Sequence, residues 1–392
     1  MRPSYESAKH TDELRVIEDH AQTAQKLSFY RGYAGAWGNI LALAKLDPPV
    51  KDIFFVDTHS GAGRHGSREH PDGAVLGTPL IACHEARRLQ RRYPKLTVHV
   101  RAVDNDKRWI ARLLQGVQPF LLTTHERDRV DVKLYPERFE DMLPVLLDEA
   151  TRAKAPSLWL LDPYGLQIPY SVVSQLQTPR WGPEVIINLD MLGMWRVDAA
   201  ARAKVDENVD AVTLGDYDAQ SCLNELFGGR EHWENIADRS LTFRDNAPRF
   251  AAAYAERFPG FTYRSHYPLR ASHGQLRHIV HLCHSDSGKE KFYGEYLRSQ
   301  DFGILAGRHL DGVAKAHAAQ RYWLSYAGEP TSVDQLYEEG TQPWDKGQIR
   351  SICTTADEER YARYDEGEGV IEWFKVRGED PTEQFYQPTL FN

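Results

Sequence analysis

Cysteine is scarce in this sequence, and the few cysteines present are not spaced for disulfide or redox chemistry. The 392 residues include four cysteines, which lie far apart and form no C-x-x-C pair: Cys83, Cys222, Cys283 and Cys353. This spacing provides neither the disulfide framework of a small secreted domain nor a paired redox motif. We therefore expect reduced thiols in a cytoplasmic protein.

Long apolar segments are missing as well. No stretch reaches the roughly 18 consecutive apolar residues that a membrane span needs. The first residues, MRPSYESAKHTDEL, contain no apolar core of a signal peptide. With 41% hydrophobic and 27% charged residues, the composition predicts a soluble globular protein without a membrane partner.

Positive charge is in the minority, since the formal net charge is −8. This balance argues against non-specific coating of nucleic acid but leaves room for a local basic groove. Residues 315–392 contain fifteen Asp and Glu against eight Lys and Arg, a net of −7. Because the chain is too long for one ordinary domain, this step predicts a domain boundary near residue 310.

Short apolar runs alternate with segments of helical spacing in the first half of the chain. A helix with one apolar face is expected over residues 26–45. Buried strands are expected over residues 53–57, 96–104, 129–135, 157–161 and 183–190. Alternation of this kind is typical of a Rossmann-like α/β fold with a parallel, doubly wound sheet.

The second half of the chain departs from this alternation. A helical insertion is expected over about residues 198–258, followed by a hairpin-like strand pair at 261–270 and 276–285. Two helices and a strand pair then follow in the order of a winged-helix domain. The expected domains are therefore a Rossmann-like domain over 1–310, a winged-helix-like domain over 311–380 and a flexible tail over 381–392.

The most specific local motif is VDTHSGAG, residues 56–63, in which a strand ends at Asp57 and Gly61-x-Gly63 follows. Glycine permits a tight turn and close approach of a ligand to the backbone, although the pair alone fits a structural turn equally well. Asp104 ends the next expected strand, where a carboxylate can accept hydrogen bonds from ribose hydroxyls. The absent third glycine and the long spacing to Asp104 argue against NAD, so S-adenosylmethionine is the better candidate.

The fourth expected strand ends in Asp162-Pro163-Tyr164-Gly165. Residues just beyond the carboxyl ends of parallel strands line the ligand crevice, so Asp57, Asp104 and Asp162 should face one cleft. A carboxylate, a proline and an aromatic ring in this order can accept a hydrogen bond from an exocyclic amine and stack on a base. The alternative is a proline turn with a packed tyrosine.

Together these motifs resemble the three-Cys-motif partner proteins. The resemblance rests on VDTHSGAG, GTPL (77–80), AVDND (102–106), LLDPYG (160–165) and a helix with Lys26, Tyr30, Tyr33 and Trp37. It implies a class I methyltransferase-like fold, a radical-S-adenosylmethionine-like partner protein bearing three cysteines, and a role in nucleic-acid modification or repair. The D-P-Y-G turn has one proline fewer than the D-P-P-Y of DNA amino-methyltransferases, so DNA, RNA and protein all stay open as acceptors.

The candidate site residues follow from these motifs and strand ends. For the cofactor they are Asp57, His59, Gly61, Gly63, Asp104, Asn105 and Glu137. For catalysis they are Asp162 and Tyr164, and for the substrate Lys26, Tyr30 and Pro163. Two rival interpretations are a non-catalytic binding module with this fold and, less favoured, an NAD-type oxidoreductase.

Two further segments contain candidate functional residues, one set for binding a metal and one for docking on another protein. His278, His281 and His284 with Cys283 resemble metal ligands. Side chains alternate along a strand, so His278 should face away from His281 and no metal is expected. The chain ends in QPTLFN, where Gln387, Leu390 and Phe391 resemble a peptide that docks on the sliding clamp. The alternative for this tail is attachment to the protein's own surface.

Overall fold

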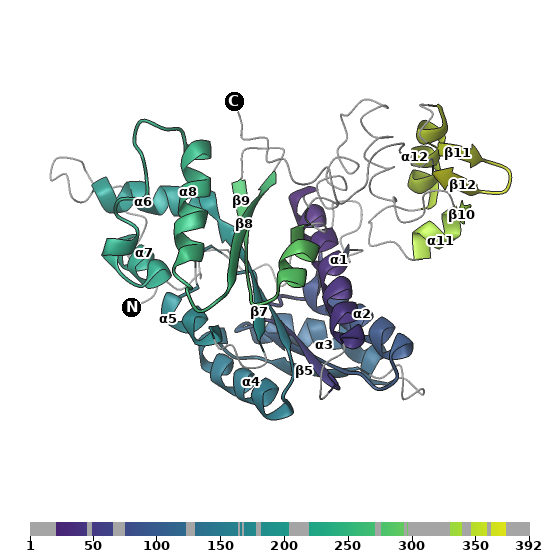
Figure 1. Ribbon diagram of the computed structural model, residues 1–392, viewed down its shortest axis with the longest axis horizontal. Coiled ribbons are helices and arrows are strands. Elements are labelled where there is room, and N and C mark those ends of the chain that lie inside the picture. The colour runs from purple at the N-terminus through teal and green to yellow at the C-terminus, as the bar shows by residue number, and fades with distance from the viewer. Residues whose placement is uncertain are drawn as a thin grey trace. The chain divides into compact units, whose positions relative to one another are not determined.

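The chain divides into two compact units, Met1–Leu297 and Arg298–Asn392 (Figure 1). The computed structural model describes residues 21–44, 49–65, 75–122, 130–163, 165–166, 168–177, 182–203, 219–270, 276–293, 296, 330–338, 346–358 and 362–373. Within these ranges, no helix combines the length and the apolar character needed to cross a membrane.

A mostly parallel, seven-stranded sheet forms the centre of the first unit. In sheet order its strands are Asp131–Tyr135 (β5), Thr97–Val103 (β4), Asp52–Asp57 (β1), Ser157–Leu161 (β6), Pro183–Asp190 (β7), Leu276–Cys283 (β9) and Tyr263–Arg270 (β8). The strands β5, β4, β1, β6 and β7 are parallel, whereas β9 runs antiparallel to both of its neighbours. The expected α/β class is confirmed, and the sheet is compatible with a Rossmann-like fold.

The order of the strands decides where a ligand can bind. After β1 the chain adds β4 and β5 on one side, and it then returns to place β6 and β7 on the other side. In open sheets of this kind the crevice beside such a reversal, at the carboxyl ends of the strands, is the usual ligand site. A functional site is therefore expected at the carboxyl ends of β1, β4 and β6.

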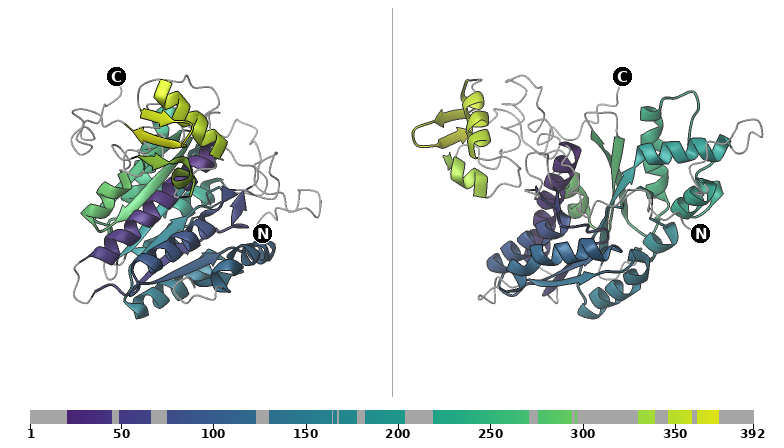
Figure 2. Two further views of the ribbon diagram at one scale, coloured as in Figure 1. Left: turned by 90° about the vertical axis from the view of Figure 1, so that its right-hand side faces the viewer. Right: turned by 180° about the vertical axis from the view of Figure 1, so that it is seen from behind.

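Helices cover both faces of the sheet (Figures 1 and 2). One apolar core lies under α1 (Ala21–Leu43), α2 (Thr78–Arg92) and α3 (Lys107–Leu121). The other lies under α4 (Phe139–Ala153), α5 (Tyr170–Val173), α6 (Met191–Ala203), α7 (Ala219–Phe227) and α8 (Phe243–Glu256). Burial on both faces explains why β1, β6 and β7 are nearly continuous apolar runs.

The region expected to be a helical insertion contributes α6, α7 and α8 to one core. α8 begins with a capping box in which Thr242 and Asp245 bond each other's backbone N–H groups. The following strand pair is the expected hairpin-like antiparallel pair at the edge of the sheet. β9 inserts between β7 and β8, so β8 forms the sheet edge.

The segment between β1 and α2 is shaped by a close approach of two backbones. β2 (Arg64–His65) pairs with β3 (Val75–Leu76), and the Gly77 N–H donates to the Gly63 carbonyl at 2.8 Å. A Cβ at Gly77 would lie 3.0 Å from the Gly63 backbone, so only glycine fits this contact without a shift. This approach sets the start of α2 beside the glycine loop.

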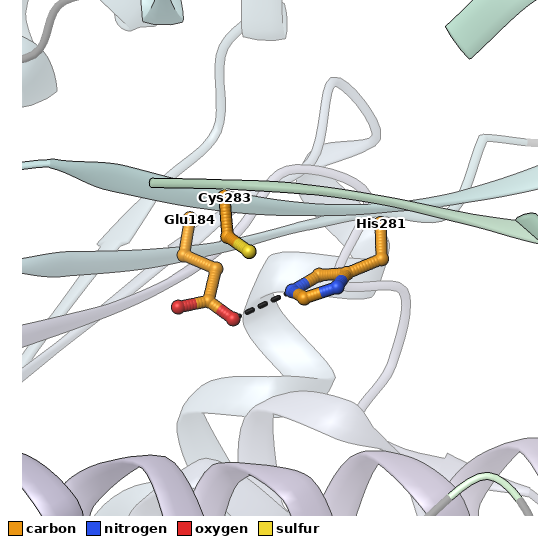
Figure 3. Close-up of side chains that lie close together, drawn as sticks. All are labelled: Glu184, His281 and Cys283. Atoms are coloured by element: carbon orange, nitrogen blue, oxygen red, sulfur yellow. Dashed lines mark hydrogen bonds and ion pairs between the residues drawn. The ribbon is translucent and has the colours of Figure 1, made fainter. Parts of the chain in front are cut away.

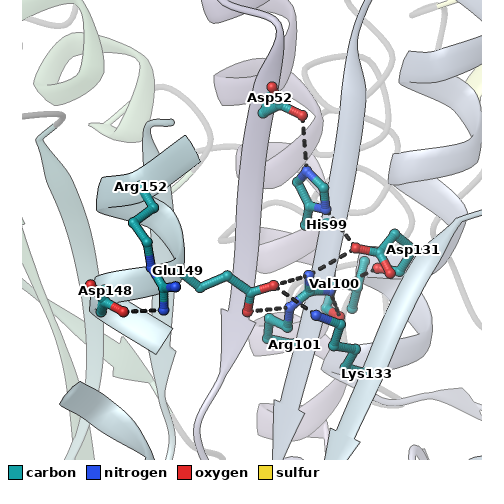
Figure 4. A network of polar contacts seen from close by, with 9 residues as sticks. All are labelled: Asp52, His99, Val100, Arg101, Asp131, Lys133, Asp148, Glu149 and Arg152. Carbon is teal, nitrogen blue, oxygen red and sulfur yellow. Dashed lines mark hydrogen bonds and ion pairs between the residues drawn. The ribbon is translucent and has the colours of Figure 1, made fainter. Parts of the chain in front are cut away.

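A charged network stabilises the edge of the sheet formed by β4 and β5 (Figure 4). Arg101 of β4 is only 1% exposed, and its guanidinium donates to Glu149 of α4 at 2.6 Å and to Asp131 of β5 at 2.8 Å. Burial alone would raise the pKa of Glu149, but the hydrogen bonds from Arg101 and Lys133 lower it to about 2. Hydrogen bonds from His99 and Arg101 also hold the pKa of Asp131 well below its usual range.

Among its described residues, the second unit contains a three-stranded antiparallel sheet and two helices. In chain order the elements are β10 (Thr331–Ser332), α11 (Val333–Glu338), α12 (Lys346–Glu358), β11 (Ala362–Asp365) and β12 (Val370–Trp373). β12 lies between β10 and β11. The two helices and the strand pair follow one another in the expected order, whereas the tail, 381–392, lies outside the described residues.

Candidate functional site

Asp57 is the last residue of β1, and its carboxyl group is buried at the reversal point of the sheet. The Thr78 hydroxyl donates to Oδ2, and the His59 backbone N–H donates to Oδ1 at 3.1 Å. Burial raises the pKa of Asp57 to about 7, because the two hydrogen bonds only partly offset the loss of solvent. Asp57 therefore changes its charge near neutral pH.

Asp104 follows β4 and fixes the glycine loop. Its Oδ2 accepts the Gly61 N–H at 2.8 Å, and its Oδ1 accepts the Asp106 N–H at 2.9 Å. Burial raises the pKa of Asp104, and these two bonds act against the rise. Because a carboxylate offers about four acceptor positions, a ribose could still bind to the same two oxygens.

The two glycines of the motif have different structural roles. Both take the left-handed conformation, with φ of +56° at Gly61 and +76° at Gly63. A Cβ on Gly61 would meet nothing within 4 Å, whereas a Cβ on Gly63 would lie 2.4 Å from Leu113 Cδ1. Gly61 therefore borders open space beside Asp104, and Gly63 is needed for packing.

Asp162, one residue beyond β6, is held by two donors. Lys26 Nζ lies 2.5 Å from Oδ2, and Asn188 Nδ2 donates to Oδ1 at 2.6 Å. The Lys26 and Asp162 side chains are only 14 and 17% exposed, so the ion pair is largely shielded from solvent. Burial would raise the pKa of Asp162, but the charge of Lys26 and the hydrogen bonds from Asn188 and Lys26 together outweigh this effect, so the pKa is lowered.

Two buried polar atoms close to these carboxyl groups have no hydrogen-bond partner among the described residues. They are the hydroxyl of Tyr30, on α1, and Oδ1 of Asn188, on β7. Burial, and then the charges of Asp162 and Asp57, raise the pKa of Tyr30 well above 10. Unpaired buried polar atoms are unfavourable, so they mark positions where polar groups of a ligand would be stabilised.

Sequence reasoning missed two members of this cluster. Arg277, at the start of β9, is close enough for its charge to lower the pKa values of Tyr30 and Asp162. β9 runs antiparallel to β7, and Arg277 pairs with Asp190, so the beginning of β9 lies at the carboxyl end of β7. Asn188 could have been noticed as the polar residue inside the apolar run PEVIINLD, but Arg277 had no comparable signal.

The remaining predicted residues differ in their exposure to solvent. His59 is largely buried next to Phe139, and burial lowers its pKa to about 4. Pro163 is buried, whereas Asn105 and Glu137 are exposed in the turns after β4 and β5. Outside the described residues lie Tyr164, Gln387, Leu390 and Phe391.

Comparison with known proteins assigns no family to the chain. No protein-family model matches it, and no curated protein matches it. What the geometry defines is a mixed α/β protein whose parallel strands bring Asp57, Asp104 and Asp162 to one edge, around a glycine loop that borders open space.

Proposed function

We propose that the chain is an S-adenosylmethionine-dependent methyltransferase that acts on nucleic acid. The observation that carries this proposal is the loop at Gly61, which Asp104 fixes and which borders open space at the carboxyl ends of β1 and β4. The strand order adds support, because the reversal beside β1 places the carboxyl ends of β1, β4 and β6 where open parallel sheets bind nucleotide-like ligands. The acidic groups suit a cofactor that carries a sulfonium and an ammonium.

In this proposal Asp104 accepts hydrogen bonds from the ribose hydroxyls of the cofactor. Asp57 and the backbone around Gly61 and Gly63 bind the methionine end, where the ionised form of Asp57 attracts the positive charge. His59, Asn105 and Glu137 are left for the adenine side. Binding is therefore expected to strengthen as pH rises through about 7, because Asp57 loses its proton in that range.

The acceptor binds on the other side, at Asp162. Asp162 stays ionised because its pKa is lowered, so it can accept a hydrogen bond from an amine while Lys26 and Asn188 hold it in place. Bound S-adenosylmethionine would supply the methyl group, Asp162 would orient the acceptor nitrogen toward it, and the proton released from that nitrogen would pass to water. The protein contributes mainly by aligning nitrogen, methyl carbon and sulfur.

We also propose partners for this activity. The second unit has the element order of a winged helix, which suggests docking to nucleic acid, yet its acidic charge favours a protein contact equally. The three-cysteine, radical-S-adenosylmethionine-like protein implied by the family resemblance is one such partner. The sliding clamp is another, and deletion of residues 387–392 should abolish clamp association if the tail is its docking peptide.

A second candidate function is a binding module without catalysis, and one observation favours it. Lys26 and Asn188 each hold one oxygen of Asp162, so this carboxylate has partners within the protein and does not require an acceptor amine. A module of this kind would bind nucleic acid or the three-cysteine protein through the same surfaces and would transfer no methyl group.

Methyl incorporation separates the two functions. The purified chain is incubated with tritiated S-adenosylmethionine and single-stranded DNA, duplex DNA, tRNA or the three-cysteine protein. An enzyme labels at least one acceptor, and Asp162→Asn or Tyr164→Phe abolishes labelling without weakening association with that acceptor. The matched control is Asp148→Asn, which alters an exposed carboxylate of α4 that pairs with Arg152. Labelling that survives in Asp162→Asn would contradict the proposed role of Asp162.

A further inference from the structure

A second group of chemically reactive side chains lies where the start of β7 meets the end of β9 (Figure 3). Glu184 is the second residue of β7, and His281 and Cys283 are near the end of β9. Val185 pairs with Leu282, so the antiparallel register places Glu184 beside Cys283. His281 and Cys283 are two residues apart and therefore share one face of the sheet.

These three residues bring three different donor atoms together. A carboxylate oxygen of Glu184, an imidazole nitrogen of His281 and the sulfur of Cys283 all lie within 4.8 Å of one another, and all three residues are buried. Glu184 Oε1 is 2.6 Å from His281 Nε2. The imidazole is fixed in this direction because it stacks on Phe292, with ring centroids 3.8 Å apart and planes at 8°.

A fourth donor comes from α1. The Tyr33 hydroxyl contacts Glu184 Oε1 and lies 3.5 Å from His281 Nε2. Tyr33 is fully buried. One phenol, one carboxylate, one imidazole and one thiol thus converge from α1, β7 and β9.

We propose that Glu184, His281 and Cys283 bind a structural Zn²⁺ ion, with Tyr33 beside the fourth position. Zinc accepts sulfur, nitrogen and oxygen ligands in four-coordinate sites. A set that mixes thiolate and imidazole with one carboxylate suits zinc better than magnesium or calcium, which prefer oxygen ligands alone. Burial of all ligands defines a closed site, which is the mark of a structural rather than a catalytic zinc.

The charge of Glu184 supports a cation at this position. Among the described residues, its hydrogen-bond partners are a phenol and an imidazole, and neither side chain carries a permanent positive charge. A carboxylate inside a protein is unfavourable unless it is paired with a positive charge or coordinates a metal. A divalent ion would supply that charge and would tie β9 to β7 and α1.

This proposal is independent of the methyltransferase proposal. Glu184 lies near the start of β7, and Asp190 ends that strand beside the cofactor crevice. Six residue steps separate them, which corresponds to roughly 20 Å along a strand. Sequence alternation alone argued against a metal because His278 faces away from His281, but the third ligand comes from a different strand.

Metal analysis tests the proposal. The intact chain, purified without chelators, should contain about one zinc ion, measured by inductively coupled plasma mass spectrometry. After removal of metal, titration with Zn²⁺ alone should restore this stoichiometry and raise the melting temperature. Cys283→Ser and His281→Asn should each lower the zinc content at least fivefold. His278→Asn, on the opposite face of β9, and Cys83→Ser, in α2, are the matched controls and should keep it.

Two results would overturn the zinc site. One is failure of the intact chain to bind Zn²⁺, and the other is full zinc retention in both ligand variants. If these variants do not fold, Co²⁺ is exchanged into the intact chain. A thiolate-to-cobalt absorption band would then support the site, and its absence would show that the cluster is a hydrogen-bonded network only.

Discussion

Replacement of Asp57 by asparagine should change the pH dependence of stability in a defined direction. The pKa of Asp57 is about 7 in the folded chain, against a usual value of 3.8. The folded state therefore binds the proton more tightly than the unfolded state does. The resulting contribution to the free energy of unfolding is complete below pH 3.8 and is lost as pH rises through about 7. The whole loss amounts to about 4 kcal/mol, and about 2.5 kcal/mol of it falls between pH 5 and pH 8.

The Asp57→Asn variant has no ionisable group at this position, so its free energy of unfolding does not show this loss. The substitution also replaces a carboxylate oxygen, which accepts a hydrogen bond, with an amide NH2 group that faces a hydrogen-bond donor. This replacement lowers the free energy of unfolding by about 1–3 kcal/mol at every pH. The free energy of unfolding of Asp57→Asn relative to wild type should therefore rise by about 2–3 kcal/mol from pH 5 to pH 8. Urea unfolding followed by circular dichroism at several pH values measures this difference.

Thr78→Val provides the matched comparison. The Thr78 hydroxyl bonds to Asp57 and lowers its pKa, so its removal should raise that pKa further. The stability of Thr78→Val should then fall more steeply with pH than that of wild type. A difference between Asp57→Asn and wild type that stays constant from pH 5 to pH 8 would refute the burial of an ionisable carboxyl at this position.

Further substitutions test other parts of the account. Gly61→Ala should cost only about 1–2 kcal/mol in thermal unfolding, because it adds φ strain in open space, yet weaken S-adenosylmethionine binding at least tenfold. Gly63→Ala should cost more than about 2 kcal/mol, because it adds a collision to the strain. Arg101→Met should destabilise by about 3 kcal/mol in urea. The stabilisation from the Arg101–Glu149 pair is present above pH 4.5 and should fade as pH falls through about 2. Lys26→Met should lower the melting temperature by leaving a shielded carboxylate without its counter-charge.

Strands β1, β6 and β7 could be predicted closely from the sequence because each is a nearly continuous apolar run. Residues 53–57 were expected and Asp52–Asp57 forms β1, and the expected run at 183–190 coincides with β7. Burial on both faces of a parallel sheet imposes this pattern locally, so no knowledge of the neighbouring strands is needed.

The pairings within the sites could not be predicted in the same way. Lys26 and Asp162 are 136 residues apart, and their contact depends on where α1 packs. Arg101 is a charged residue inside an expected strand, and only its partners on β5 and α4 explain its burial. Asp104 was expected to bind a ribose, and its bond to the Gly61 N–H shows that it also shapes the loop.

Isothermal titration of the intact chain with S-adenosylmethionine tests the central claim most directly. The account predicts one site per chain with a dissociation constant below millimolar. It also predicts at least tenfold weaker binding in Asp104→Asn, and unchanged binding in Asp106→Asn, which alters the carboxylate that caps α3. Absence of binding at millimolar cofactor, or equal effects of the two substitutions, would contradict it.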